Sequence, residues 1–335
     1  MTFLLGGEIE AIGDDVEAGS EEVIVEAQAP PSDALTAKSS KWRDLSTRIL
    51  SAMGMIAFLG GLSFYFKEDG LTALVCLLQF MMFGEMTRTI GGDDWGSLGA
   101  TLRKYWWFAT AAVAFNAPKI FAWKQLAIEA TAIGMGVSMG VVGSVLSFQF
   151  QGSGTVEFRE FIRQAAVSLL SAILVVLPSS YWIGTLEEHG MKWIFLPAAL
   201  VAINDIMAYV FGRLIGKHPL LPSISPKKTW EGFLGAALST VGTAWVGLAE
   251  NEGGAALLGP GLKGISRTDG VALAIVASTI APFAGFLASV IKRAYGRKDF
   301  GNTFPGHGGF VDRLDCQLIM APVVFFYLSL YKAAN

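Results

Sequence analysis

The sequence predicts an all-α polytopic membrane protein with about nine transmembrane helices and a cytosolic N-terminus. Three observations support this fold class: the composition, the number of apolar runs long enough to span a bilayer, and the distribution of Lys and Arg between those runs. Hydrophobic residues make up 53% of the 335 residues, charged residues only 16%, and the mean hydropathy is +0.50. Because one soluble core cannot bury so many apolar side chains, the composition excludes an ordinary soluble globular protein.

Apolar runs of roughly 20 residues, the length needed to cross about 30 Å of hydrocarbon, recur along the chain. The candidate runs are 47–66, 71–87, 105–121, 126–149, 161–182, 191–211, 230–248, 271–291 and 317–331. Glu85 and Pro178 interrupt the second and the fifth run, and the last run is short. Each run predicts one transmembrane helix.

Lys and Arg are distributed unequally between the two sets of alternate loops. If the N-terminus lies in the cytosol, 18 of the 25 Lys and Arg residues fall on the cytosolic side and 7 on the other. Cytosolic loops of membrane proteins carry an excess of these residues. The distribution therefore favours nine spans, and it places the charge-rich segments 213–228 and 292–313 on the cytosolic face.

The N-terminal segment differs from the rest in composition. The first 37 residues contain no Lys or Arg and many Asp and Glu, with Ala, Gly and a Pro30–Pro31 pair. This predicts a disordered acidic tail, residues 1–40, followed by one transmembrane domain, residues 41–335. The missing positive charge disfavours a cleaved signal and an Arg-rich transit peptide. With only Cys76 and Cys316, a disulfide framework and a cysteine-based zinc site are excluded.

The stretch from Ser289 to Asp315 places a dense set of charges between two apolar runs. Its first cations are Lys292, Arg293, Arg297 and Lys298. Lys as a point charge and Arg as a bidentate fork both suit phosphate groups. The turn 305–309, which ends in Gly308 and Gly309, can bring backbone N–H groups close to an anion. His307 has no second His or Cys at ligand spacing, so phosphate contact or a role in loop structure is favoured over zinc.

Three carboxylates accompany these cations. Asp312 and Asp315 follow the turn three residues apart, where the last helix should begin, so their side chains share one face. Asp299 precedes them by a loop long enough to fold back. Hard oxygen donors beside cations fit a Mg²⁺ ion that bridges substrate phosphates. The alternative is a solvated loop of the positive-inside type, which accounts for the cations and leaves the three aspartates unexplained.

A second polar group lies between residues 204 and 235. Asn204 and Asp205 fall within an otherwise apolar span, where a carboxylate costs several kcal/mol unless it faces a wet cavity or a partner. We therefore expect Asp205 to face the site; pairing with a basic residue on a neighbouring helix, or an early end of the span, would also account for it. Lys227 and Lys228 precede the next span and can hold a nucleotide triphosphate or an anionic lipid head group.

The segment 289–317 resembles the signature of the phosphatidate cytidylyltransferases, also called CDP-diacylglycerol synthases. That signature runs S-x-x-K-R, four residues, K-D, then P-G-H-G-G and D-R-x-D. Its fixed positions are all filled, by Ser289, Lys292, Arg293, Lys298, Asp299, Pro305, Gly306, His307, Gly308, Gly309, Asp312, Arg313 and Asp315. The Asn204–Asp205 pair and the SPKKTWEGF segment resemble the eukaryotic branch, and the likeness covers roughly residues 45–331.

The resemblance implies transfer of the cytidylyl group of CTP to phosphatidic acid, giving CDP-diacylglycerol and pyrophosphate for phosphatidylinositol, phosphatidylglycerol and cardiolipin synthesis. It implies Mg²⁺, held with a second cation in a paired metal centre. The implied catalytic residues are Asp299, Asp312, Asp315 and Lys298, and the implied metal ligands are Asp299, Asp312, Asp315 and Asp205. The implied ligands of the substrate phosphates are Lys227, Lys228, Lys292, Arg293, His307, Gly308, Gly309, Arg313 and Ser225.

The expected partners are CTP, phosphatidic acid, the lipid bilayer and a second copy in a homodimer, and no nucleic acid. The eukaryotic likeness favours the endoplasmic reticulum, with the active site facing the cytosol. Two other functions stay open. A CTP-dependent polyprenol or dolichol kinase would release CDP, but that class lacks the full PGHGG and DRxD string. A non-enzymatic transporter would distribute polar residues along several spans, whereas here they concentrate at one membrane face.

Overall fold

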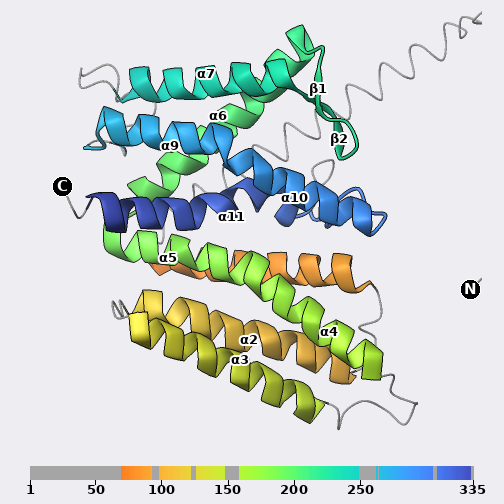
Figure 1. Ribbon diagram of the computed structural model, residues 1–335. Helices are drawn as coiled ribbons and strands as arrows, with labels where there is room; N and C mark the ends of the chain where they lie inside the picture. Colours follow the sequence, from red (N-terminus) through yellow and green to blue (C-terminus); the bar gives the residue numbers. More distant parts are fainter. Residues whose placement is uncertain are drawn as a thin grey trace, which may run out of the picture. The chain divides into compact units, whose positions relative to one another are not determined.

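The structure is a computed structural model that describes residues 69–92, 98–121, 126–147, 158–248, 262, 264–304 and 308–332. Its first helix, Asp69–Gly91, is drawn in orange without a label in Figure 1. The labelled elements are α2 (Leu98–Ile120), α3 (Leu126–Ser147), α4 (Phe158–Ser171), the π-helical turn η2 (Ala172–Val176), α5 (Leu177–His189), α6 (Lys192–Ile215), β1 (Pro219–Leu221), β2 (Ser225–Thr229), α7 (Trp230–Gly247), α9 (Arg267–Thr279), α10 (Ala281–Ala294), α11 (Val311–Phe326) and the π-helical turn η4 (Tyr327–Lys332).

The all-α polytopic fold is confirmed. Six helical segments of the described residues are long and apolar enough to cross a membrane: Asp69–Gly91, Ile128–Ser147, Phe158–His189, Lys192–Ile215, Arg267–Ala294 and Val311–Leu330. Every predicted span from 71–87 onwards coincides with a helix. The predicted span 47–66 and the predicted tail 1–40 lie outside the described residues, so the number of nine spans stays a prediction.

The helix ends follow local sequence signals. Thr229 caps α7, because its side chain accepts a hydrogen bond from the Gly232 N–H at 3.2 Å. Ser266 caps α9 in the same way through the Asp269 N–H at 3.1 Å. Pro282 lies in the first turn of α10, where a missing N–H costs nothing, and marks the break between α9 and α10.

The last helix lies in the middle of the packing. α11 contacts α5 on one side and α9 and α10 on the other (Figure 1). The largest hydrophobic core joins α6, α9 and α11 through buried side chains such as Leu200, Leu273 and Met320. A second core joins Met82 and Met86 of the first helix to Val311 and Leu318 of α11. Through these two cores α11 packs against α6 and α9 and also against the first helix.

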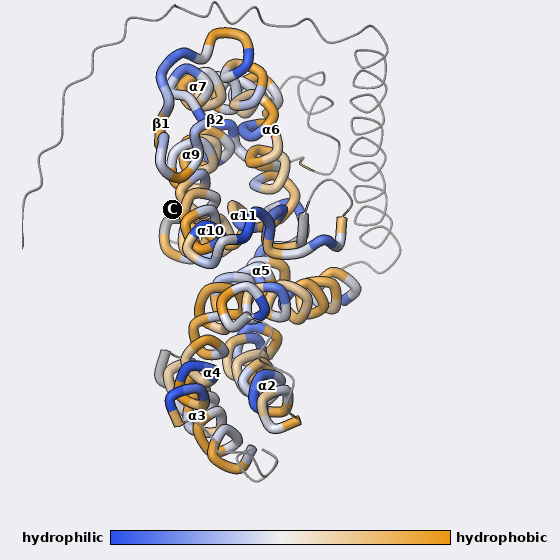
Figure 2. The backbone as a smooth tube through the Cα atoms, turned by 90° about the vertical axis from the view of Figure 1, so that its right-hand side faces the viewer, coloured by the Kyte–Doolittle hydropathy of each residue, from blue (hydrophilic) through white to orange (hydrophobic). Residues whose placement is uncertain are grey.

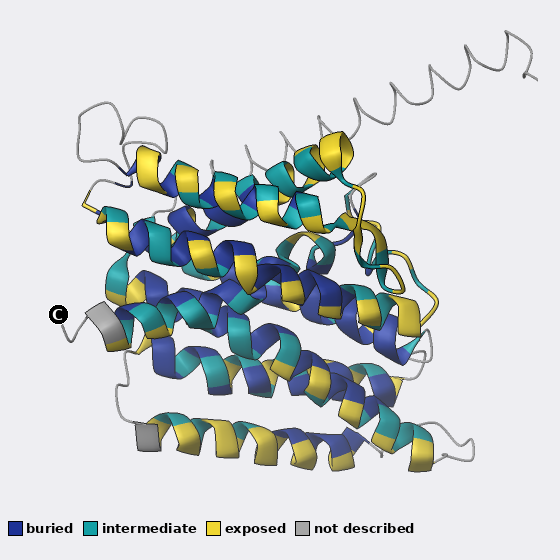
Figure 3. Ribbon diagram, turned by 45° about the horizontal axis from the view of Figure 1, so that its top comes forward, coloured by how far each residue is buried: buried dark blue, intermediate teal, exposed yellow. Residues whose placement is uncertain are grey.

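Apolar surface covers much of the protein. Hydrophobic residues run along most helices, among them α5 and α6 (Figure 2). α3 packs on α2 and is exposed along most of its remaining length (Figure 3). The side chains of Met135, Val145 and Leu146 are among the exposed large hydrophobic ones, with 59–63% of each residue exposed. Lipid tails are as apolar as these side chains, so a bilayer accounts for such a surface.

Two local features differ from the expectation. Arg103 and Lys104, which precede the predicted span 105–121, lie within α2 and are buried. The Arg103 guanidinium donates to Gln164 Oε1 at 3.0 Å and stacks over the Phe161 ring. The segment that carries Lys227 and Lys228 forms an antiparallel hairpin, β1 with β2, which the sequence pattern did not predict.

Candidate active site

A cavity of about 450 Å³ opens between the hairpin and four helices. It is lined from α6, β2, α7, α10 and α11, and includes Asn204, Asp205, Ser225, Lys227, Lys228, Ser289, Asp312, Arg313 and Asp315. The two polar segments predicted from the sequence, which lie about a hundred residues apart, therefore meet in one place.

α6 brings two polar side chains into this cavity. Asp205 exposes its carboxylate there, and the preceding Asn204 is buried. The side-chain oxygen of Asn204 has no hydrogen-bond partner among the described residues. Buried polar atoms normally find a partner, so an unpaired oxygen buried in the wall of the cavity indicates a place for a bound group.

The hairpin places Lys228 between two carboxylates. The Lys228 ammonium lies 4.4 Å from the centre of the Phe286 ring and interacts electrostatically with both Asp205 and Asp315. A Cβ atom at Gly285 would lie 3.5 Å from Asp315 Oδ2 and 3.7 Å from Lys228 Nζ, so both side chains meet above this glycine. This cation and the two carboxylates form a charged group in the wall of the cavity.

The base of the hairpin is held by Glu231. Its carboxylate accepts hydrogen bonds from the backbone N–H groups of Lys217 and His218 and contacts the His218 ring. Through these contacts Glu231 ties the residues that precede β1 to the start of α7.

Asp312 is engaged by three donors. Its Oδ1 receives the Lys292 ammonium at 2.7 Å, and its Oδ2 accepts the N–H groups of Phe300 at 2.8 Å and Gly309 at 2.9 Å. Only 2% of the Asp312 side chain and 13% of the Lys292 side chain are exposed. Asp312 thus organises the loop that precedes α11, and Lys292 is already paired with it.

The glycine-rich turn uses its own backbone donors. Gly308 has a φ of 80°, a value that favours glycine, and its carbonyl accepts the Phe304 N–H at 2.9 Å. The Gly309 N–H, expected to face a substrate phosphate, donates to the Asp312 carboxylate. Pro305, Gly306 and His307 lie outside the described residues, so phosphate contact by His307 stays a prediction.

Six of the described residues predicted for the site do not line the cavity: Lys292, Arg293, Lys298, Asp299, Gly308 and Gly309. Asp299 lies beside Gly308, where its Cβ would be 3.3 Å from a Cβ added to that glycine. Arg293 donates to the Arg297 carbonyl at 3.3 Å, and Lys298 is exposed. The cavity therefore contains Asp205, Asp312 and Asp315, but not Asp299.

The described residues fit a divalent cation only in part. No group of three or more His, Cys, Asp or Glu at metal-binding separation occurs in the described part of the chain. Asp205, Asp315 and the unpaired Asn204 oxygen nevertheless offer hard oxygen donors at one cavity. Mg²⁺ commonly takes one or two protein carboxylates and completes its shell with water and substrate phosphates, so this donor set suits it.

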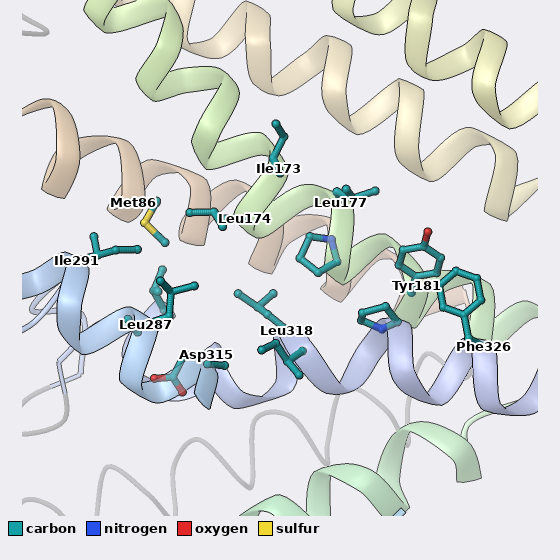
Figure 4. Close-up of a pocket in the computed structure, with 16 residues that line it drawn as sticks. Met86, Ile173, Leu174, Leu177, Tyr181, Leu287, Ile291, Asp315, Leu318 and Phe326 are labelled. Atoms are coloured by element: carbon teal, nitrogen blue, oxygen red, sulfur yellow. The ribbon is translucent and has the colours of Figure 1, made fainter. Parts of the chain in front are cut away.

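An apolar groove of about 300 Å³ adjoins the polar cavity. Figure 4 shows side chains of η2, α5, α10 and α11 around it, among them Ile173, Leu177, Leu287 and Leu318. Among the described residues, Asp315 is the only charged one that lines the groove, and it lines the polar cavity as well. One carboxylate thus stands where a hydrophobic groove and a charged cavity meet.

Glu85 is a site residue that the sequence analysis missed. Its carboxylate lies on the first helix and accepts hydrogen bonds from Thr303, Phe310 and Val311, next to the glycine-rich turn. The sequence does contain a signal for Glu85. A carboxylate within an apolar run is costly in free energy, so it usually has a partner or a function.

Comparison with known proteins identifies the family. The pattern described as "Cytidylyltransferase family" matches residues 46–331, most of the chain. The protein therefore belongs to the cytidylyltransferase family, and the family expected from the signature is confirmed.

Several curated proteins are similar over part of the chain. Phosphatidate cytidylyltransferase 3 of Arabidopsis thaliana is 38% identical over 202 residues, 50% of this chain and 42% of that protein. Phosphatidate cytidylyltransferase 1 of Homo sapiens is 36% identical over 196 residues, 47% of this chain and 42% of that protein. Phosphatidate cytidylyltransferase of Encephalitozoon cuniculi (strain GB-M1) is 42% identical over 159 residues, 42% of this chain and 40% of that protein. The chain spans less than half the length of these relatives.

Proposed function

We propose that this integral membrane protein transfers the cytidylyl group of CTP to phosphatidic acid, giving CDP-diacylglycerol and pyrophosphate. The observation that carries the proposal is the position of Asp315, which lines both the charged cavity and the apolar groove. A reaction between a water-soluble triphosphate and a lipid phosphate needs such a junction. The names of the similar proteins support the same reaction.

The chemistry asks for positioning rather than for a strong base. A phosphate oxygen of phosphatidic acid forms a bond to the α-phosphorus of CTP, and the bond from that phosphorus to the β-bridging oxygen breaks, so pyrophosphate leaves. The attacking phosphate is already anionic, so catalysis consists of orientation and charge neutralisation. Lys227, Lys228 and Arg313 line the cavity and supply positive charge for these phosphates.

Asp205 and Asp315, with the Asn204 side-chain oxygen, are the residues that would hold Mg²⁺ in this cavity. A bound Mg²⁺ would supply positive charge against the triphosphate. Asp312 has a different role in this proposal. It binds Lys292 and the Gly309 N–H, and so holds the glycine-rich turn in place beside the site.

The apolar groove is the proposed place for one acyl chain of the lipid. Ile173, Leu287 and Phe326 are about half exposed along it, so the groove is accessible from the lipid side. The π-helical turn η2 forms part of its wall, and π-helical turns are frequent at functional sites. With the chain in the groove, the lipid phosphate reaches the cavity at Asp315.

The proposed location and assembly rest on the charge distribution, the similar proteins and the family resemblance. The excess of Lys and Arg on one side of the spans supports an active site that faces the cytosol. Similarity to proteins of Arabidopsis thaliana and Homo sapiens, both eukaryotes, supports the endoplasmic reticulum. A homodimer is proposed from the family resemblance, and CDP-diacylglycerol would serve the synthesis of phosphatidylinositol, phosphatidylglycerol and cardiolipin.

The product distribution tests this proposal. Membranes that contain the protein are incubated with phosphatidic acid, Mg²⁺ and CTP labelled on the cytidine, with dolichol in a parallel reaction. We expect label in the lipid phase and an equal amount of pyrophosphate. Label that stays in water as CDP while dolichol gains phosphate would establish the kinase, and CTP left intact in both reactions would remove the enzyme assignment.

A further inference from the structure

Glu85 is a buried acid on the first helix, and its contacts reach the opposite end of the sequence. Only 7% of the residue is exposed. Oε1 accepts hydrogen bonds from the Phe310 N–H and the Thr303 hydroxyl, both at 3.0 Å, and Oε2 accepts the Val311 N–H at 3.0 Å. The backbone contacts join residues more than two hundred positions apart in the chain.

These bonds satisfy the start of α11. The first N–H groups of a helix have no partner within the helix and need acceptors from elsewhere. Phe310, the residue at the N-cap position, supplies no side-chain cap. Gly309 donates to Asp312, while Phe310 and Val311 donate to Glu85, so two carboxylates take up three consecutive N–H groups. The helix dipole also stabilises a negative charge at this end of the helix.

The fit around Glu85 depends on two glycines. A Cβ atom at Gly301 would lie 2.6 Å from Oε1, and a Cβ atom at Gly309 would lie 2.4 Å from Oε2. Such separations are far inside van der Waals contact, so any side chain at either position would displace the carboxylate. The turn and the acid are therefore shaped to one another.

We propose that Glu85 is a positioning residue that sets the orientation of α11, and so directs Arg313 and Asp315 into the cavity. Arg313 and Asp315 follow Val311 by two and four positions and both line the cavity. Glu85 does not line the cavity, so it acts through the helix that it caps. The inference rests on the proposed cytidylyl transfer for its kinetic consequences, and on the hydrogen bonds alone for its structural ones.

The first test is Glu85→Gln in the full-length protein. The variant keeps the size of the side chain, but in either orientation its amide N–H₂ would face a backbone N–H, of Val311 or of Phe310, so donor meets donor. A misplacement of about 1 Å at reacting groups can cost about a hundredfold in rate. We expect kcat to fall about 10- to 100-fold, while the KM for CTP changes by a smaller factor, because two of the three cations that line the cavity, Lys227 and Lys228, lie on the hairpin.

Gln79→Ala is the matched control on the same helix. Gln79 is fully buried, and its hydrogen-bond partners, Asn116 and the Val176 carbonyl, lie outside α11. This substitution should lower the melting temperature but leave kcat per folded molecule unchanged. If Glu85→Gln behaved in the same way, Glu85 would be structural only and the proposal would fail.

A double-variant cycle tests the route of the effect. Gly301→Ala should lower kcat in the wild-type background, because its methyl group displaces Glu85. In a Glu85→Ala background the added methyl group has nothing to displace, so kcat should fall no further. Equal losses in both backgrounds would show that Gly301 acts independently of Glu85 and would overturn the proposed fit.

Amide hydrogen exchange separates this inference from the proposed function. In Glu85→Gln the N–H group that meets the amide N–H₂, of Val311 or of Phe310, should lose protection, while that of Gly309, held by Asp312, should keep it. An inactive wild-type protein with this exchange pattern would sink the cytidylyl transfer and leave the capping role intact. Unchanged protection at Phe310 and Val311 would refute the capping role whatever the activity.

Discussion

Lys292→Met should destabilise the protein, because Lys292 forms an ion pair with a nearly buried carboxylate. The Nζ to Oδ1 distance to Asp312 is 2.7 Å, and the two side chains are 13% and 2% exposed. Removal of one partner from a buried pair costs roughly 3–5 kcal/mol, since the other charge stays buried. Asp312 keeps the N–H groups of Phe300 and Gly309, so we expect the lower end, about 3 kcal/mol.

Thermal unfolding of purified protein in detergent, followed by Trp fluorescence, measures this effect. In large domains about 1 kcal/mol corresponds to roughly 2–4 °C, so the melting temperature should fall by at least about 6 °C. Lys292→Arg retains a cation and should recover most of the loss. Lys227→Met is the matched control, because Lys227 is exposed on β2 and has no ion pair within the described residues. A Lys292→Met protein that melts with the wild type would refute the structural role and return Lys292 to phosphate binding alone.

Two further predictions concern the substrate and the metal. Leu177→Trp should fill the apolar groove and lower the rate with long-chain phosphatidic acid at least about tenfold, a change of about 1.4 kcal/mol in barrier, while the dihexanoyl lipid is spared. The control Val113→Trp, in the separate apolar groove between α2 and α3, should alter neither rate. If Leu177→Trp lowered the rate equally with both lipids, the groove would not be the place of the acyl chain. Asp205→Asn should raise the Mg²⁺ concentration for half-maximal activity at least about tenfold, and an unchanged Mg²⁺ response would remove Asp205 from the proposed donor set.

The spans and the two polar segments could be predicted from the sequence because each is a local property. Length and apolarity alone decide whether a run such as 191–211 crosses a membrane, and α6 covers that run. The signature residues also identified the family, which the match over residues 46–331 confirms.

The division of labour among the acids could not be predicted, because it depends on three-dimensional partners. Asp312 and Asp315 lie three residues apart in the same segment, so the sequence does not distinguish their roles. In the structure three donors surround Asp312, whereas Asp315 lines both the polar cavity and the apolar groove. The burial of Arg103 likewise depends on Gln164, 61 positions away. The hairpin was missed because SPKKT lacks the alternating apolar pattern of a strand.

The rate of CDP-diacylglycerol formation by purified Asp315→Asn and Asp299→Asn proteins tests the central claim most directly. The claim is that the reaction takes place where the charged cavity meets the apolar groove, at Asp315 and away from Asp299. We predict that Asp315→Asn lowers the rate at least about 100-fold with normal folding, and that Asp299→Asn retains more than about a tenth of it. An Asp315→Asn protein that retained more activity than Asp299→Asn would place the chemistry elsewhere and contradict the account.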